Sequence, residues 1–171
     1  MTRVSILVAV LIAFALPGWA QPVAGTAAVA APSAQEFADK AVAASQFAIA
    51  ASEIALKRSV DRKVRKFAEQ IAEDYRTGSL YISEAAASNK LRVPDRLPAD
   101  LQSRLARLEN APPDDIDTLF TREMSQMHGD AIPLFTAYAQ AGDNRSLRFL
   151  AGRALPTLRE HYSSLLQLAA R

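Results

Sequence analysis

Hydrophobic residues recur at alternating steps of four and three along most of the chain, which is the spacing of one face of an α-helix. Long segments with this pattern cover residues 34–58, 60–89, 115–141 and 145–170. No segment shows the strict alternation of a half-buried strand. The pattern predicts an all-α protein whose four long helices pack as a bundle.

Each expected helix has one row of residues that should face the core. The first has Val42, Ile49 and Leu56, flanked by Phe37 and several alanines. The row of the second helix is Val60, Val64, Phe67, Ile71, Asp74, Gly78, Tyr81 and Ala85. The row of the third is Phe120, Met124, Met127, Ala131, Leu134 and Tyr138. The row of the fourth is Leu147, Ala151, Ala154, Leu158, His161, Leu165 and Leu168. Two rows therefore place an ionisable residue, Asp74 or His161, among apolar neighbours.

Local signals mark where the helices begin and end. Ser33, with Glu36 three residues later, forms a capping box that starts the first helix at about residue 34. Gly142 and Asn144 are a stop signal and a new N-cap between the last two helices. Residues 91–114 place prolines on both sides of "ADLQSRLARLEN". We therefore expect a long connection between the second and third long helices, containing a short helix and crossing the length of the bundle.

The first 20 residues have the three parts of a secretory signal peptide: a basic start at Arg3, an apolar run over residues 4–16 and a small-residue exit ending at Ala20. We expect cleavage after Ala20 and a location in the periplasm or outside the cell. Residues 21–34 are rich in Ala, Pro and Gly and are typical of a flexible linker. Residues 35–171 should then form one four-helix bundle domain, with no transmembrane anchor after processing.

Composition excludes several classes of function. The chain has no cysteine, so disulfides, thiolate catalysis and Cys-ligated metal sites are excluded. The formal net charge is +2, without the concentrated basic field of a nucleic-acid-binding protein. One basic cluster does stand out, around the expected turn between the first two helices. Its members are Lys57, Arg58, Arg62, Lys63, Arg65 and Lys66. We favour a solvated helix end for this cluster, with contact to an envelope protein or an anionic envelope surface as the alternative.

Three polar residues on or beside the apolar rows should lie at a similar height in the bundle. Counting the helical rise from the expected turns brings Asp74, His128 and His161 within about one turn of a common level. The favoured interpretation is a hydrogen bond between His161 and Asp74 across the core. The alternative is a mononuclear site for zinc, iron or copper formed by Asp74, His128 and His161. Tyr75 is an accessory candidate.

Glu53 is also an accessory candidate, but it falls more than a turn away from this level. We therefore expect it to pair with a basic residue near the helix end. The di-iron signature of ferritin-like proteins, Glu-x-x-His on two helices, does not occur. Glu160 and His161 are adjacent in sequence and point about 100° apart on a helix. Oxidase chemistry therefore has little support.

Three stretches resemble a known family: "FADKAVAASQFAIAASEIALKRSVDRKVRKFAEQIAEDYRTGS", "DIDTLFTREMSQMHGDAIPLF" and "LRFLAGRALPTLREHYSSLLQLA". They are similar to the domain of unknown function 4142 family of bacterial envelope proteins, from about Phe37 to the C-terminus and including the spacing of Pro156 and His161. The resemblance implies a ferritin-like helical bundle in the envelope, and it implies no established reaction. The family's polar positions fall on Glu53, Asp74-Tyr75, His128 and His161. Tyr75 replaces the family's histidine, which weakens a metal site built on three histidines.

Two functions from different classes follow from the sequence. We favour an exported helical-bundle protein with a non-enzymatic role in the envelope, either in interactions or in stress. The alternative is a mononuclear metal-binding or metal-dependent redox protein that uses the core Asp and His residues. The sequence does not identify a partner or an oligomeric state.

Overall fold

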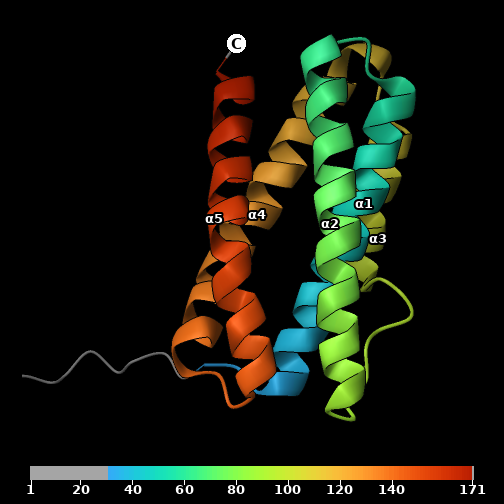
Figure 1. Cartoon of the computed structure of the whole chain (residues 1–171). Helices are drawn as coiled ribbons and strands as arrows, with labels where there is room; N and C mark the ends of the chain where they lie inside the picture. The colour runs from blue at the N-terminus through green and yellow to red at the C-terminus, as the bar shows by residue number, and fades with distance from the viewer. Residues whose placement is uncertain (1–30, 171) are drawn as a thin grey trace, which may run out of the picture.

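The computed structural model describes residues 31–170 of the chain (Figure 1). Its helices are α1 (Ala34–Arg58), α2 (Arg62–Ser88), α3 (Ala99–Glu109), the 3-10 helix η1 (Pro113–Asp115), α4 (Ile116–Ala141) and α5 (Arg145–Ala169). No strand occurs within this range. The all-α prediction is confirmed. The predicted signal peptide and most of the predicted linker lie outside the described residues.

The predicted helix ends are confirmed by cap hydrogen bonds. The Ser33 backbone N–H donates to Glu36 Oε2 at 2.9 Å, and the Glu36 N–H donates to Ser33 Oγ at 3.3 Å, which completes the capping box of α1. Gly142 ends α4, and Asn144 Oδ1 accepts from the Leu147 N–H at 3.1 Å to start α5. These caps satisfy backbone groups that a helix end otherwise leaves unpaired.

The long helices form two hairpins, α1–α2 and α4–α5, which pack against each other through α1 with α4 and α2 with α5. The α1–α4 contact is close because α1 presents small side chains, and Ala41, Ala48, Ala51 and Ala55 are all buried. Near the start of α1, Phe37 stacks on Tyr138 with ring centroids 4.1 Å apart and meets Phe135 edge-on at 5.0 Å. One continuous core therefore joins the two hairpins.

The connection between α2 and α4 contains the predicted short helix, α3, and three side chains of α1 bind this connection. Gln35 exchanges hydrogen bonds with the Arg92 backbone, at 2.8 and 3.1 Å. Gln46 Nε2 donates to the Pro94 carbonyl at 3.1 Å. At the far end of α1, the Arg58 guanidinium donates to the carbonyls of Leu108, Glu109 and Ala111, where α3 ends.

The predicted core rows are wrong in parts of three helices. In the second half of α2 the buried residues are Tyr75, Ile82 and Ala86, whereas the sequence pattern predicted Asp74, Tyr81 and Ala85. In α4, Phe135 is buried where Leu134 was predicted, and in α1 the Phe37 and alanine row is buried more deeply than Ile49 and Leu56. A row drawn at 3.5 residues per turn drifts on a helix with 3.6. In α2 and α4 the next residue along the chain then faces the core, whereas in α1 the buried Ala48 and Ala55 come one position before Ile49 and Leu56.

Val60 is a separate error, because it lies before α2 begins and is 89% exposed. The row predicted for α5 is largely confirmed, since Leu147, Ala151, Leu158, His161 and Leu165 are buried. Within residues 31–170, none of the helices is both long enough and apolar enough to cross a membrane.

Candidate functional site

Asp74 of α2 and His161 of α5 form the predicted hydrogen bond. His161 Nε2 lies 2.9 Å from Asp74 Oδ2, and because a carboxylate oxygen accepts, Nε2 is the donor. The two groups differ in environment, since the His161 side chain is 2% exposed and that of Asp74 is 41% exposed. Asp74 therefore lies at the edge of the core, and the prediction of a carboxylate inside it is wrong. The drift of the α2 row accounts for the difference.

A second pair lies deeper, between Tyr75 of α2 and His128 of α4. His128 Nδ1 is 2.8 Å from the Met124 carbonyl, which can only accept, so Nδ1 carries the proton. His128 Nε2 then accepts from the Tyr75 hydroxyl at 3.2 Å. Both ring nitrogens of His128 are therefore occupied, and His128 is neutral.

Burial reinforces this protonation state. Loss of hydration lowers the pKa of His128 to about 4, opposed by its bond to Met124 and assisted by the nearby His161. Burial, with a smaller contribution from the Asp74 charge, raises the pKa of the Tyr75 hydroxyl above its ordinary value. The Tyr75 hydroxyl stays protonated, and the pair is a neutral hydrogen-bonded unit.

The three predicted ligands do lie at one level of the bundle. The rings of His128 and His161 meet edge-on with centroids 5.5 Å apart, and Tyr75 is 6.1 Å from His161. Their polar atoms do not converge, however, because Asp74 binds the nitrogen of His161 and His128 binds Met124 and Tyr75. Across residues 31–170, no group of three or more His, Asp or Glu side chains is arranged to hold a metal ion. In this arrangement the donor set does not fit a mononuclear metal.

One polar atom of the site has no partner. His161 Nδ1 is buried and makes no hydrogen bond within the described part of the chain. Since Nε2 donates its proton to Asp74, Nδ1 is the ring nitrogen that has a lone pair in the neutral form of the imidazole. The Asp74–His161 unit therefore presents a buried acceptor oriented by a carboxylate.

His161 also borders a groove between α2 and α5, with a volume of about 680 Å³. The same groove is lined by Asp74, Tyr75 and Tyr81 from α2, by Phe135 from α4 and by several α5 side chains. The sequence does not reveal this groove, because a groove depends on how far apart two helices lie. Two of its aromatic residues, Tyr81 and Phe149, are 56% and 66% exposed, although the sequence pattern placed Tyr81 in the core row of α2.

Glu53 pairs with a basic residue, as predicted, but that residue is in the middle of α2 and not near the helix end. Arg76 Nη2 is 2.8 Å from Glu53 Oε1, with both side chains about half exposed. The basic cluster is only partly solvated, because Arg58 binds the end of α3. The other five cations of the cluster are exposed: Lys57, Arg62, Lys63, Arg65 and Lys66.

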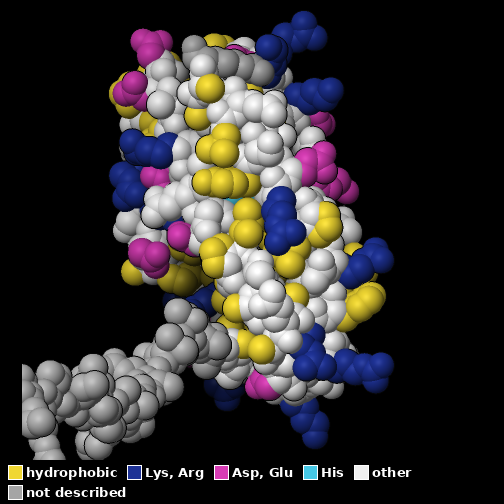
Figure 2. Space-filling view, turned by 90° about the vertical axis from the view of Figure 1, so that its left-hand side faces the viewer, with side chains coloured by type: hydrophobic (Ala, Val, Ile, Leu, Met, Phe, Trp, Pro, Cys, Tyr) yellow, Lys and Arg dark blue, Asp and Glu magenta, His cyan; other side chains and the backbone are white. Residues whose placement is uncertain are grey.

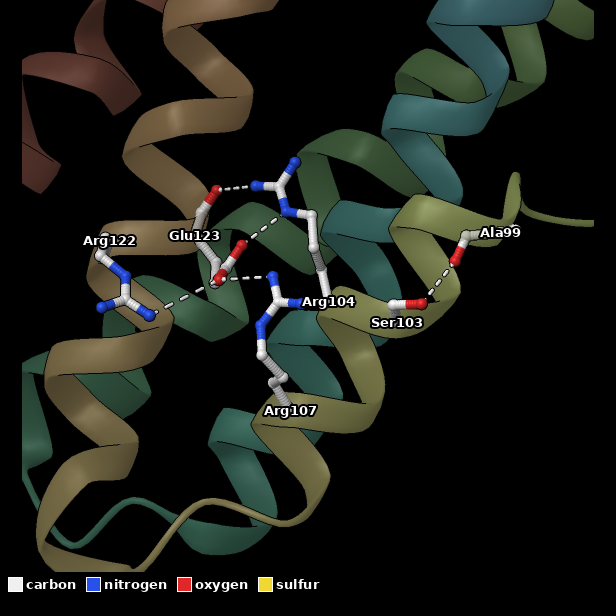
Figure 3. Close-up of polar contacts among 6 residues, drawn as sticks. All are labelled: Ala99, Ser103, Arg104, Arg107, Arg122 and Glu123. Atoms are coloured by element: carbon white, nitrogen blue, oxygen red, sulfur yellow. Dashed lines mark hydrogen bonds and ion pairs between the residues drawn. The ribbon is translucent and has the colours of Figure 1, made fainter.

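A second buried polar cluster, which was not predicted from the sequence, is centred on Glu123 of α4 (Figure 3). Arg104 Nε of α3 donates to Glu123 Oε2 at 2.5 Å, and Arg104 Nη2 donates to the Glu123 carbonyl at 2.8 Å. Arg107 and Arg122 lie 3.4 and 3.8 Å from Oε1. The Arg104 guanidinium also covers the Phe47 ring at 4.6 Å. A lone Glu beside Met124 gave no signal of this arrangement, which joins α1, α3 and α4.

Comparison with known proteins supports the fold. The crystal structure of a DUF305 fragment from Deinococcus radiodurans is similar, with a TM-score of 0.73 and 18% identity, over 83% of this chain and 98% of that chain. At this identity the similarity indicates a shared fold alone. No curated protein matches the chain. The model of the family described as Domain of unknown function (DUF4142) matches residues 20–168, and the chain therefore belongs to that family.

Proposed function

We propose that this protein is exported to the periplasm and acts there without catalysis, by docking one end of its bundle on an anionic envelope surface. The proposal rests on the composition of the α1–α2 turn, where the apolar side chain of Val60 is 89% exposed. Around it are the five exposed cations Lys57, Arg62, Lys63, Arg65 and Lys66. An apolar tip surrounded by positive charge suits a surface of acidic phospholipid headgroups.

The arrangement of this end favours contact over simple solvation. Leu56 and Val60 border a shallow depression of about 420 Å³ together with Arg62, Arg65, Lys66 and Glu69. Glu69 offsets one charge, and Asp61 caps α2 by accepting from the Lys63 and Val64 N–H groups. The remaining cations are each worth about 1 kcal/mol beside an anionic bilayer. Reversible, salt-sensitive binding is the expected behaviour.

Export is tested by cell fractionation and intact mass. The apolar run over residues 4–16 and the Ala20 exit support a mature N-terminus at Gln21 in the periplasmic fraction. A chain that keeps Met1 and sediments with membranes would show that the N-terminal segment is an anchor. This measurement tests compartment separately from surface binding.

Surface binding is tested by co-sedimentation of the mature protein with vesicles of phosphatidylglycerol and phosphatidylcholine. We expect binding to the mixed vesicles, loss at high salt and no binding to pure phosphatidylcholine. Changing Arg62, Lys63, Arg65 and Lys66 to Gln should weaken binding by at least about tenfold. The control changes Lys90, Arg92 and Arg96 to Gln in the connection that follows α2, and this variant should bind normally. Equal loss in both variants would contradict docking through the α1–α2 turn.

The alternative function is metal binding by Asp74, His128 and His161. This alternative is favoured because the three residues lie at a similar height in the bundle. It is opposed because both ring nitrogens of His128 already have hydrogen-bond partners. Elemental analysis of protein purified from the periplasm without an affinity tag tests it. A stoichiometric metal that is lost when any of the three residues is changed would establish this alternative.

A further inference from the structure

The groove between α2 and α5 has the size and the walls of a small-molecule site. Its volume of about 680 Å³ lies within the range of about 300–1,000 Å³ that is typical of ligand pockets. Most of its walls are apolar or aromatic, and the largest of these side chains are Tyr75, Tyr81, Phe135 and Phe149. Figure 2 shows hydrophobic side chains gathered along the middle of the neighbouring α4–α5 face. A ligand with a ring or other flat apolar body would be covered on several sides.

The buried end of the groove supplies a hydrogen-bond acceptor. His161 is 1% exposed, borders the groove and has an unpartnered Nδ1. Its tautomer is fixed by the bond from Nε2 to Asp74. Nδ1 is itself buried, so a ligand O–H reaches it only when neighbouring side chains of the groove move aside. The bond then satisfies an acceptor that has no partner in the free protein.

The open end of the groove supplies a positive charge. Arg153 lines it, with its guanidinium 5.9 Å from the centre of the Phe149 ring. Within residues 31–170, no carboxylate lies close enough to form an ion pair with Arg153. Arg153 precedes His161 on α5 by eight residues, or about 12 Å of helix. This distance sets the length of ligand that can use both groups.

Asp74 determines the orientation of such a ligand. Its half-exposed carboxylate lies at the His161 end and disfavours a second negative charge there. An acidic group is therefore directed to Arg153, and a neutral donor to His161. Thr77 and Thr157 also line the groove and offer further hydroxyl groups.

We propose that the α2–α5 groove binds a small, extended phenolic acid. The ring lies between the apolar walls, the phenol hydroxyl donates to His161 Nδ1, and the carboxylate pairs with Arg153. The site binds its ligand and transforms nothing. It is independent of the basic end of the bundle and of the docking proposed above.

The test is isothermal titration of the mature protein with three probes. 4-Hydroxycinnamate carries both polar groups, cinnamate lacks the hydroxyl, and 4-hydroxycinnamyl alcohol lacks the carboxylate. We expect 4-hydroxycinnamate to bind about tenfold more tightly than either of the others, since each lost polar contact is worth about 1–1.5 kcal/mol. Equal affinities, or no binding by 4-hydroxycinnamate at millimolar concentration, would overturn the proposal.

Two variants separate the polar contacts. In Arg153→Gln, 4-hydroxycinnamate should fall to the affinity of the alcohol, whereas Arg159→Gln on the same helix, outside the groove lining, should change nothing. In His161→Phe, 4-hydroxycinnamate and cinnamate should bind equally. If His161→Phe does not fold, the ¹⁵N resonance of His161 Nδ1 in the wild-type protein provides the same information. It should shift on adding 4-hydroxycinnamate and stay fixed on adding cinnamate; a fixed resonance with both would refute the contact.

Discussion

Two buried polar clusters of this bundle, one around Glu123 and one around His128 and His161, differ in how their polar atoms are paired. Glu123 is charged and has cations on several sides, of which Arg104 is itself largely buried. The His128 and Tyr75 pair is neutral, and its neighbour His161 keeps one nitrogen unpartnered. The Glu123 cluster lies under α3, whereas the His161 cluster borders an open groove.

This difference separates a structural role from a binding role. Every polar atom of the Glu123 carboxylate has a partner, so the cluster has nothing to offer a ligand. It joins the α3 connection to α4, and the charges stabilise the bundle only while both partners are present. The His161 cluster leaves an acceptor beside an apolar space. A fully satisfied buried cluster therefore indicates architecture, and an incompletely satisfied one indicates a candidate site.

The largest expected effect comes from breaking the charged cluster. Arg104→Met should lower the free energy of unfolding by about 3–5 kcal/mol, because it leaves the buried Glu123 carboxylate without its closest cation. Urea unfolding followed by circular dichroism measures this loss. The control is Arg107→Met, whose side chain is 55% exposed and should cost below about 1 kcal/mol. Equal losses in the two variants would show that Arg104 has no special role.

The neutral cluster predicts that the stability of the protein depends on pH. His128 has a pKa of about 4 in the folded protein and an ordinary value of 6.5 when unfolded. Between these values the unfolded chain binds more protons, so stability falls as the pH is lowered from about 6.5 to about 4. The loss should reach about 3 kcal/mol at pH 4, compared with His128→Gln over the same range. Parallel pH profiles for wild type and variant would contradict the neutral state of His128.

Removing His161 should have a smaller effect. His161→Ala should cost about 1–3 kcal/mol of unfolding free energy, through lost packing and the lost bond to Asp74. Asp74→Asn should cost less than about 1 kcal/mol, since Asp74 is exposed to water. Thermal unfolding of the two variants checks this order. An Asp74→Asn variant as unstable as His161→Ala would mean that the carboxylate is more deeply buried than the structure indicates.

Metal addition should produce the smallest effect of all. Wild-type protein should keep its melting temperature when zinc or iron is added in micromolar excess, because both His128 nitrogens are occupied. A metal that binds only the folded state would raise the melting temperature by mass action. A rise that disappears in Asp74, His128 and His161 variants would make the neutral cluster a metal centre.

Much of the site was predictable from the sequence because helical rise fixes height along a bundle. Counting residues placed Asp74, His128 and His161 at one level, and the bond between His161 and Asp74 is confirmed. The height of each residue along the bundle does not predict the hydrogen bond between His128 and Tyr75, because that bond depends on how α2 is rotated about its own axis. It also does not predict the pairing of Glu123 with Arg104, since residues on different helices give no local signal of contact.

By itself, the sequence determined the helices, their caps and the path of the chain. These follow from interactions between residues a few positions apart, such as Ser33 with Glu36 and Asn144 with Leu147. The tertiary structure alone decided which residues of each helix face the core, that Arg58 binds the α3 end, and that a groove lies beside His161. The physical reason is that small rotational differences accumulate over a helix of 27 residues such as α2. Contacts between helices then select, from residues one position apart, the side chain that is buried.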